Sequence, residues 1–206
     1  EAIKMAPIIH QAKMQDDIEY KVCVTAQHRE MLDQVLDLYD IKPDYDLDIM
    51  SKKQDLFDVT TSVISGLKDI LIKEAPDLVL VQGDTTTTMA ASLAAFYLKI
   101  KIAHVEAGLR TENKYSPFPE EINRRIASCL ADFHFCPTEL SKKNLLKEGI
   151  SENDIFVTGN TIIDALLIAK GKVLVEEDNY RKHFSFLEND KKIILITGHR
   201  RENFGK

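Results

Sequence analysis

The sequence has no tryptophan, only three cysteines and no long apolar run. Cys23, Cys129 and Cys136 are odd in number and lack the spacing of metal ligands, so they do not predict a metal site. Each lies in an apolar strand or helix, where we expect a buried, reduced thiol and therefore a cytoplasmic setting. No apolar stretch approaches the roughly 18 residues that a membrane span needs. We therefore expect no association with a membrane.

Positive charge is also scarce. The 27 Lys and Arg residues are outnumbered by 33 Asp and Glu residues, which gives a formal net charge of −6. This balance argues against a general nucleic-acid binder, because no basic stripe remains once the acids are counted. Hydrophobic residues make up 44% of the 206 positions and charged residues 29%, a globular composition with enough apolar residues for a sizeable core.

Two common nucleotide-binding signatures are missing. The sequence has no G-x-x-x-x-G-K-[ST], the lysine-containing loop that surrounds nucleotide phosphates. It also has no G-x-G-x-x-G, so nothing supports a nicotinamide cofactor. We expect neither a cofactor nor a metal.

Strand-like apolar runs alternate with helical segments along most of the chain. The clearest runs, residues 76–82 and 99–106, are apolar enough for central strands that are covered on both faces. Strands that alternate with helices of this length predict βα units, a parallel sheet and right-handed crossovers. The expected fold class is α/β, with a Rossmann-like parallel sheet.

A change of character towards the end of the sequence indicates a domain boundary. We expect residues 1–170 to form an N-terminal Rossmann-like domain and the charged stretch 171–190 to be a linker or surface helix. Residues 191–206 then begin a second α/β domain, most of which is absent from this chain. The sequence starts without Met and directly with a helical pattern, so we expect a truncated chain that lacks its first strand.

Ionisable side chains stand at the ends of the predicted strands. Asp84 and Glu106 follow the two clearest strands, Glu120 opens the helix after the loop YSPFP, and His199 follows the last strand. Ligands of parallel α/β sheets bind beyond the carboxyl ends of the strands. Three carboxylates and an imidazole on one rim would form an acid–base cluster.

Each carboxylate also has an ordinary structural explanation. Asp84 or Thr85 can cap the helix that follows, and Glu106 can pair with Arg110. Glu120 lies four residues before Arg124 and Glu121 four before Arg125, which allows two surface ion pairs. The residues alone leave these alternatives open.

Other polar residues give weaker signals. Lys4, in the first helix, can reach a phosphate or remain exposed to solvent. His104 and His134 lie inside predicted strands and are expected to be hydrogen-bonded core histidines.

Six segments, in this order, resemble the non-hydrolysing bacterial UDP-N-acetylglucosamine 2-epimerases: EAIKMAP, TAQHREMLDQVL, GDTTTTMAASLAAFY, HVEAGLRT, YSPFPEEINRR and TGHRREN. The resemblance implies a two-domain fold like that of glycosyltransferase-B enzymes, with the active site in the interdomain cleft, and a homodimer. It implies interconversion of UDP-N-acetylglucosamine and UDP-N-acetylmannosamine for cell-surface polysaccharide synthesis, without a nicotinamide or an obligatory metal. The family reaction removes the C2 proton and UDP, then adds UDP back and reprotonates C2 from the other face.

Carried over by motif, the resemblance implies catalytic roles for Asp84, Glu106, Glu120, Arg124 and His199. Arg124 would support Glu120 or the substrate, and His199 would contact the nucleotide sugar near its pyrophosphate. Lys4 matches a position that contacts a phosphate of the nucleotide sugar. The chemistry needs a base on one face of C2 and an acid on the other. Their assignment stays open, with Glu106 or Asp84 favoured as the base.

Some relatives bind a second UDP-N-acetylglucosamine as an activator. Gln27, His28 and Lys53 fall near the positions used for it, but Glu30 and Lys53 differ from the Gln and Arg that can occur there, which leaves this allosteric site open. A hydrolysing epimerase or a glycosyltransferase of the same architecture is the alternative function. We expect the isolated chain 1–206 to be inactive, because the second domain holds most of the uridine and diphosphate contacts in the family.

Overall fold

The computed structural model describes residues 1–26, 29–51, 54–187 and 191–196 of the chain. The chain divides into two compact units, Glu1–Ala169 and Lys170–Lys206. All strands found in the described residues belong to the first unit. The first unit also contains the carboxylates of the predicted site, so its architecture determines how they are placed.

The strands are parallel throughout. Four of them form a sheet in the order β3 (Leu78–Gln82), β4 (Lys101–Val105), β5 (Phe133–Cys136) and β6 (Ile155–Val157). Two short strands, β1 (Cys23–Val24) and β2 (Tyr45–Asp46), form a separate parallel pair. The α/β class with parallel strands is therefore confirmed.

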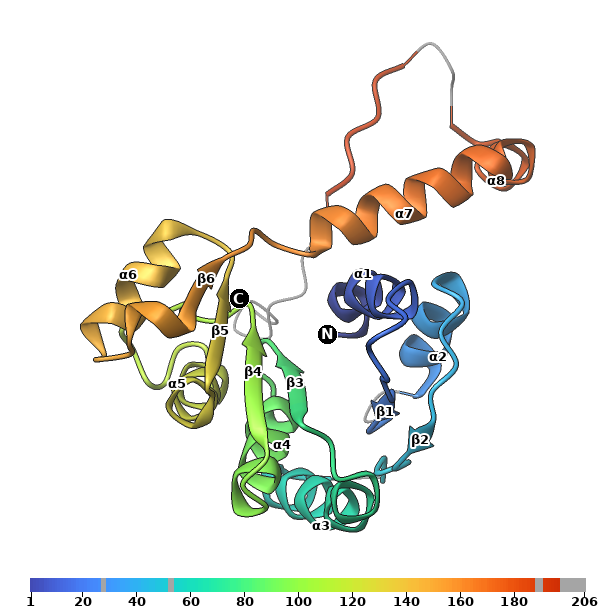
Figure 1. Ribbon diagram of the computed structural model, residues 1–206. Helices are drawn as coiled ribbons and strands as arrows, with labels where there is room; N and C mark the ends of the chain where they lie inside the picture. Colours follow the sequence, from blue (N-terminus) through green and yellow to red (C-terminus); the bar gives the residue numbers. More distant parts are fainter. Residues whose placement is uncertain (27–28, 52–53, 188–190, 197–206) are drawn as a thin grey trace. The chain divides into compact units, whose positions relative to one another are not determined.

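Helices alternate with the strands, and those from α2 to α6 each lie between one strand and the next along the chain (Figure 1). The helix bounds in the described residues are α1 Ala2–Lys13, α2 Arg29–Leu38, α3 Leu56–Glu74, α4 Thr86–Tyr97, α5 Glu120–Leu130, α6 Glu139–Lys147, α7 Ile162–Val175 and α8 Glu177–His183, with a 3-10 turn at Glu152–Asp154. Within the described parts of the chain, none of these helices has the length and apolarity needed to cross a membrane.

The largest core cluster lies between α3, α4 and the first strands of the four-stranded sheet (Figure 1). Helix α3 contributes a stripe at four-residue spacing, Val59, Val63, Leu67 and Leu71. The facing side of α4 consists of small residues, Ala90, Ala91, Ala94 and Ala95. Alanine is the best helix former and allows a close approach of the two backbones. The alanine-rich segment is therefore explained by packing, while the polar start of α4 faces the site.

The end of the described chain differs from the sequence-based expectation. Residues 191–196, which we expected to begin a strand of a second domain, have no regular secondary structure. The charged stretch around 171–190 is largely helical where it is described, because α7 continues to Val175 and α8 follows directly. Its description as a surface helix is thus the better of the two alternatives. The existence of a second domain stays a prediction.

Candidate active site

The carboxyl ends of β3 and β4 are adjacent, and this brings two predicted site residues together. Gln82 and Val105 are partners in the parallel register, and the Gly83 amide donates to the Val105 carbonyl at 3.0 Å. Glu106 follows Val105 directly, and Asp84 follows Gly83. The sheet therefore presents Asp84 and Glu106 on neighbouring strand ends, as predicted from their positions in the sequence.

Glu106 is surrounded by hydrogen-bond donors. Lys4 Nζ lies 2.7 Å from each of its carboxylate oxygens, Gln82 Nε2 donates to Oε2 at 2.7 Å, and Asn160 Nδ2 donates to Oε1 at 2.9 Å. Only 11% of the Glu106 side chain is exposed. Hydrogen bonds to an ionised acceptor are about twice as strong as neutral ones. The three donors therefore hold the carboxylate through both of its oxygens.

The backbone at Glu106 is strained. Its φ is 65°, in the left-handed region that costs a non-glycine residue roughly 1–2 kcal/mol. Strain of this kind persists only where the surroundings fix it, and it is typical of functional sites. The neighbouring turn avoids the same strain by using Gly83 at φ 77°. The Glu106 carboxylate is thus aimed at a particular position despite the local cost.

Asp84 is held by the helix that carries the third predicted carboxylate. Arg124 Nη2 donates to Asp84 Oδ2, and Asn123 Nδ2 donates to the Asp84 carbonyl at 3.0 Å. The cap of α4 is instead Thr85, whose hydroxyl accepts from the Thr88 amide at 3.2 Å. The alternative that Asp84 caps this helix is therefore wrong, because its carboxylate points to Arg124.

The two glutamates at the start of α5 have different environments. Glu120 Oε2 is buried and, among the described residues, has no hydrogen-bond partner. Glu121 is fully buried and accepts from Arg125 Nε at 3.0 Å. The suggested Glu120–Arg124 ion pair does not form, because Arg124 turns towards Asp84 and towards Glu121 at 3.4 Å.

Arg110 does not neutralise Glu106. Its guanidinium donates to both oxygens of Glu148, the residue directly after α6, at 2.7 and 2.6 Å, and this pair holds the pKa of Glu148 below its usual value. The alternative of a Glu106–Arg110 pair is therefore wrong. The cation that pairs with Glu106 is Lys4, which the sequence suggested as a phosphate ligand or an exposed side chain. The two residues are 102 positions apart in the sequence.

Both strand histidines are core residues, as expected. His104 Nε2 lies 2.7 Å from the Gly83 carbonyl, which can only accept, so Nε2 carries the proton. Burial lowers the pKa of His104 to about 4, which keeps the imidazole neutral. His134 lies opposite it on β5, with Nε2 2.9 Å from the Ser128 carbonyl.

The cysteines only partly fit the expectation of buried thiols. Cys136 is buried and Cys23 is partly buried, and burial raises the pKa of each thiol to about 11. Cys129 is exposed, so the expectation is wrong there. It follows Ser128 on α5, and one residue turns a helix by about 100°, which carries Cys129 off the buried stripe.

Four predicted residues lie outside the described part of the chain. These are the catalytic candidate His199 and the allosteric candidates Gln27, His28 and Lys53. Their roles stay predictions. In the ranges that are described, no group of three or more His, Cys, Asp and Glu side chains is placed to hold a metal ion.

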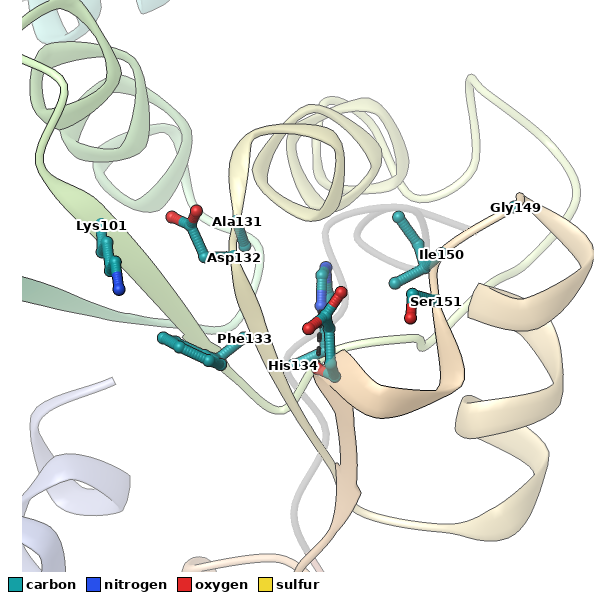
Figure 2. A pocket seen from close by; sticks show the side chains of 9 residues that line it. Lys101, Ala131, Asp132, Phe133, His134, Gly149, Ile150 and Ser151 are labelled. Atoms are coloured by element: carbon teal, nitrogen blue, oxygen red, sulfur yellow. Dashed lines mark hydrogen bonds between the residues drawn. The ribbon is translucent and has the colours of Figure 1, made fainter.

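An open hollow of about 410 Å³ lies at the other end of the strands, away from Asp84 and Glu106 (Figure 2). It is lined by residues at the amino ends of the strands, among them Lys101 at the start of β4 and Phe133 at the start of β5. Ligands of parallel α/β folds bind at the carboxyl ends. This hollow is therefore separate from the rim that carries Asp84 and Glu106.

Three amide side chains of the site were missed from the sequence. Gln82 and Asn160 donate to Glu106, and Asn123 donates to the carbonyl of Asp84. Gln82 ends β3, and Asn160 lies three residues beyond the end of β6, so both stand at strand ends like the acids. Their position at strand ends was the feature of the sequence that could have identified them. Amide side chains carry no charge, so they stand out less in a sequence than the acids beside them.

Comparisons with known proteins agree with this architecture. A family model for UDP-N-acetylglucosamine 2-epimerase matches residues 10–206. The chain is 56% identical over 208 residues to the UDP-N-acetylglucosamine 2-epimerase of Yersinia pestis, covering 100% of this chain and 55% of the relative. It is 57% identical to the enzyme of the same name from Neisseria meningitidis, covering 100% and 56%.

Solved structures give the same result. The Neisseria meningitidis UDP-GlcNAc 2-epimerase bound to UDP-GlcNAc superimposes with a TM-score of 0.95 at 56% identity, over 99% of this chain and 56% of that chain. The Methanocaldococcus jannaschii enzyme in complex with UDP-GlcNAc and UDP gives a TM-score of 0.82 at 39% identity, over 90% and 51%. The chain spans about half the length of these relatives. Since a family model matches almost its whole length, the chain belongs to the UDP-N-acetylglucosamine 2-epimerase family, as its six motifs predict.

Proposed function

We propose that a full-length protein containing this chain interconverts UDP-N-acetylglucosamine and UDP-N-acetylmannosamine by elimination and re-addition of UDP. Family membership supports this activity, and a relative 56% identical in sequence is described as bound to UDP-GlcNAc. The observation that carries the proposal is the carboxylate of Glu106, held by three hydrogen-bond donors at the carboxyl end of β4.

The chemistry assigns different tasks to the carboxylates. Glu106 accepts the C2 proton of UDP-N-acetylglucosamine while the C1–O bond to UDP breaks, which leaves a 2-acetamidoglucal. UDP then adds back at C1, and an acid delivers a proton to the opposite face of C2. Glu120 fits the acid, because its Oε2 is buried without a donor that would compete with a proton on it.

Asp84 and Arg124 act as a pair in this scheme. Arg124 keeps Asp84 in an ion pair beside Glu106, and only 28% of the Asp84 side chain and 10% of the Arg124 side chain are exposed. In this scheme the pair positions the substrate. His199 and Lys4 complete the set, His199 near the pyrophosphate and Lys4 holding Glu106. The protein acts as a homodimer, and light scattering of the full-length protein measures its subunit number.

Incubation of the full-length protein with UDP-N-acetylglucosamine in D2O tests the reaction. NMR should show both epimers, deuterium at C2 and retention of the UDP linkage. Free N-acetylmannosamine with released UDP would identify a hydrolysing epimerase instead, and a lack of deuterium with UDP retained would exclude C2 deprotonation. The 206-residue chain alone should show no turnover, and measurable epimerisation by it would contradict that expectation.

Matched amide variants separate the base from the acid. Glu106→Gln should lower the rate of C2 proton removal from UDP-N-acetylglucosamine by roughly 10²–10⁴-fold, the usual contribution of general base catalysis. Glu120→Gln should still release UDP and the glycal from that substrate, without forming the second epimer. With UDP-N-acetylmannosamine as substrate, the two phenotypes should exchange. Loss of proton removal in both variants from both substrates would refute the assignment.

A further inference from the structure

Glu121, next to the proposed acid, is a charged group buried within the first unit. Its side chain is 0% exposed. A buried carboxylate is costly unless it is paired and hydrogen-bonded. Burial by itself raises the pKa of Glu121, but hydrogen bonds from Arg125 and Thr111 outweigh it and hold this pKa below the usual value. The protein therefore maintains an ionised carboxylate where no solvent reaches it.

The partners of Glu121 come from two different segments. The Thr111 amide, in the segment between β4 and α5, donates to Oε2 at 3.0 Å. Arg125 Nε donates to Oε1 at 3.0 Å, and Arg124 Nη1 lies 3.4 Å from Oε2. Both oxygens are thus occupied, and Glu121 fixes the segment after Glu106 to the helix that carries Arg124.

Arg124 connects Glu121 to the proposed site. Its Nη2 donates to Asp84, its Nη1 faces Glu121, and its buried Nε has no partner within the described part of the chain. Asp84 and Glu121 are the two carboxylates within ion-pair distance of this guanidinium among the described residues. Without Glu121, Asp84 would be the one carboxylate left to restrain Arg124 among the described residues.

We propose that Glu121 is a positioning residue of the proposed epimerisation: it orients Arg124, and through Arg124 it fixes the carboxylate of Asp84. Glu121 is too deeply buried to touch the substrate. The inference rests on the proposed function, because the step that Asp84 and Arg124 serve is C2 epimerisation. It explains why two adjacent glutamates begin α5 with different surroundings, Glu121 paired on both oxygens and Glu120 Oε2 without a partner among the described residues.

A double-mutant cycle in a full-length protein containing these residues tests this role. Glu121→Gln keeps the shape of the side chain, but the new amide has a single acceptor oxygen. The Thr111 amide, Arg125 and Arg124 together need two acceptor oxygens at this position. We expect kcat to fall roughly tenfold with KM within about twofold, because small displacements of a positioning group reduce kcat strongly. Arg124→Lys should also lower kcat about tenfold. Because Glu121 acts through Arg124, the double variant should lose about as much as the worse single variant, well short of the roughly hundredfold that independent effects would give.

Several results would overturn the proposal. A kcat for Glu121→Gln equal to that of the wild type would do so, as would single losses that multiply in the double variant. Glu112→Gln is the matched control. It removes an exposed carboxylate that lies 3.4 Å from Arg125, so its kcat should equal that of the wild type.

A second variant covers the case in which Glu121→Gln fails to fold. Arg125→Gln removes the partly exposed guanidinium that holds Glu121 Oε1, so the buried carboxylate is less firmly oriented towards Arg124. Arg125→Gln should lower kcat about threefold. Combined with Arg124→Lys, the two losses should not multiply. Losses that multiply, or an unchanged kcat for Arg125→Gln, would refute the proposal. An inactive wild type would instead contradict the proposed function, so the two failures are distinguishable.

Discussion

Gly108, two residues beyond Glu106, is the position where a single methyl group should disturb the fold most clearly. Its φ is +85°, and a Cβ built on it would lie 2.3 Å from the backbone carbonyl oxygen of Ser141 in α6. Asn144 of the same helix donates to the Gly108 carbonyl at 3.0 Å. The segment that carries Glu106 therefore packs directly on the backbone of α6.

Gly149 provides a matched control for Gly108→Ala. It has φ +86°, and no heavy atom lies within 4 Å of a Cβ built there. Gly149→Ala should therefore cost only the left-handed conformation, about 1–2 kcal/mol. Gly108→Ala has the same conformational cost and in addition a clash with the backbone of Ser141, which cannot rotate away as a side chain could. Overpacking of this kind costs about a further 1–3 kcal/mol of stability. The difference between the two variants isolates the contact with Ser141.

Urea unfolding of both variants, followed by far-UV circular dichroism in the full-length protein, measures this difference. We expect Gly108→Ala to have the lower midpoint by an amount equivalent to at least about 1 kcal/mol, at an unchanged m-value. Equal midpoints would refute the close approach of α6 to Gly108. A lower midpoint for Gly149→Ala would refute the physical reasoning as a whole.

Two further predictions concern buried titratable groups. Burial lowers the pKa of His104 to about 4, against 6.5 for an unperturbed histidine. As the pH falls, the unfolded state therefore binds a proton at this side chain before the folded state does. The free energy of unfolding should fall by up to about 1.4 kcal/mol per pH unit from pH 6.5 down to 4. His104→Gln should lack this part of the decline in urea unfolding across that range, and parallel curves for variant and wild type would contradict it. At pH 8, iodoacetamide should label Cys129 well before Cys23 and Cys136, whose thiol pKa values are raised to about 11. Peptide mass spectrometry checks the order, and first labelling of Cys136 would contradict its burial.

The alternation of strands and helices was readable from the sequence because each element carries a periodic apolar pattern. The runs that became β3 and β4 were found in this way, and with them the positions of Asp84 and Glu106. Topology then required the two strand ends to be neighbours. Both the α/β class and this part of the candidate site therefore followed from local patterns and a general rule.

The partners of the carboxylates could not be predicted in the same way. Lys4 and Glu106 are 102 residues apart, and no local spacing indicates their contact. On α5, Glu120 and Glu121 each precede an arginine by four residues, so the sequence treats them alike. A rotation of about 100° between adjacent residues decides which one is buried, and it depends on how the helix packs.

The Asn160 side chain hydrogen-bonds to two parts of the structure at once. Its Oδ1 accepts from the Ile162 amide at 3.1 Å at the start of α7, while its Nδ2 holds Glu106. One planar amide group thus joins the first turn of that helix to Glu106. A shift of this first turn must either move the Glu106 carboxylate or break one of these two hydrogen bonds, so the two positions are coupled.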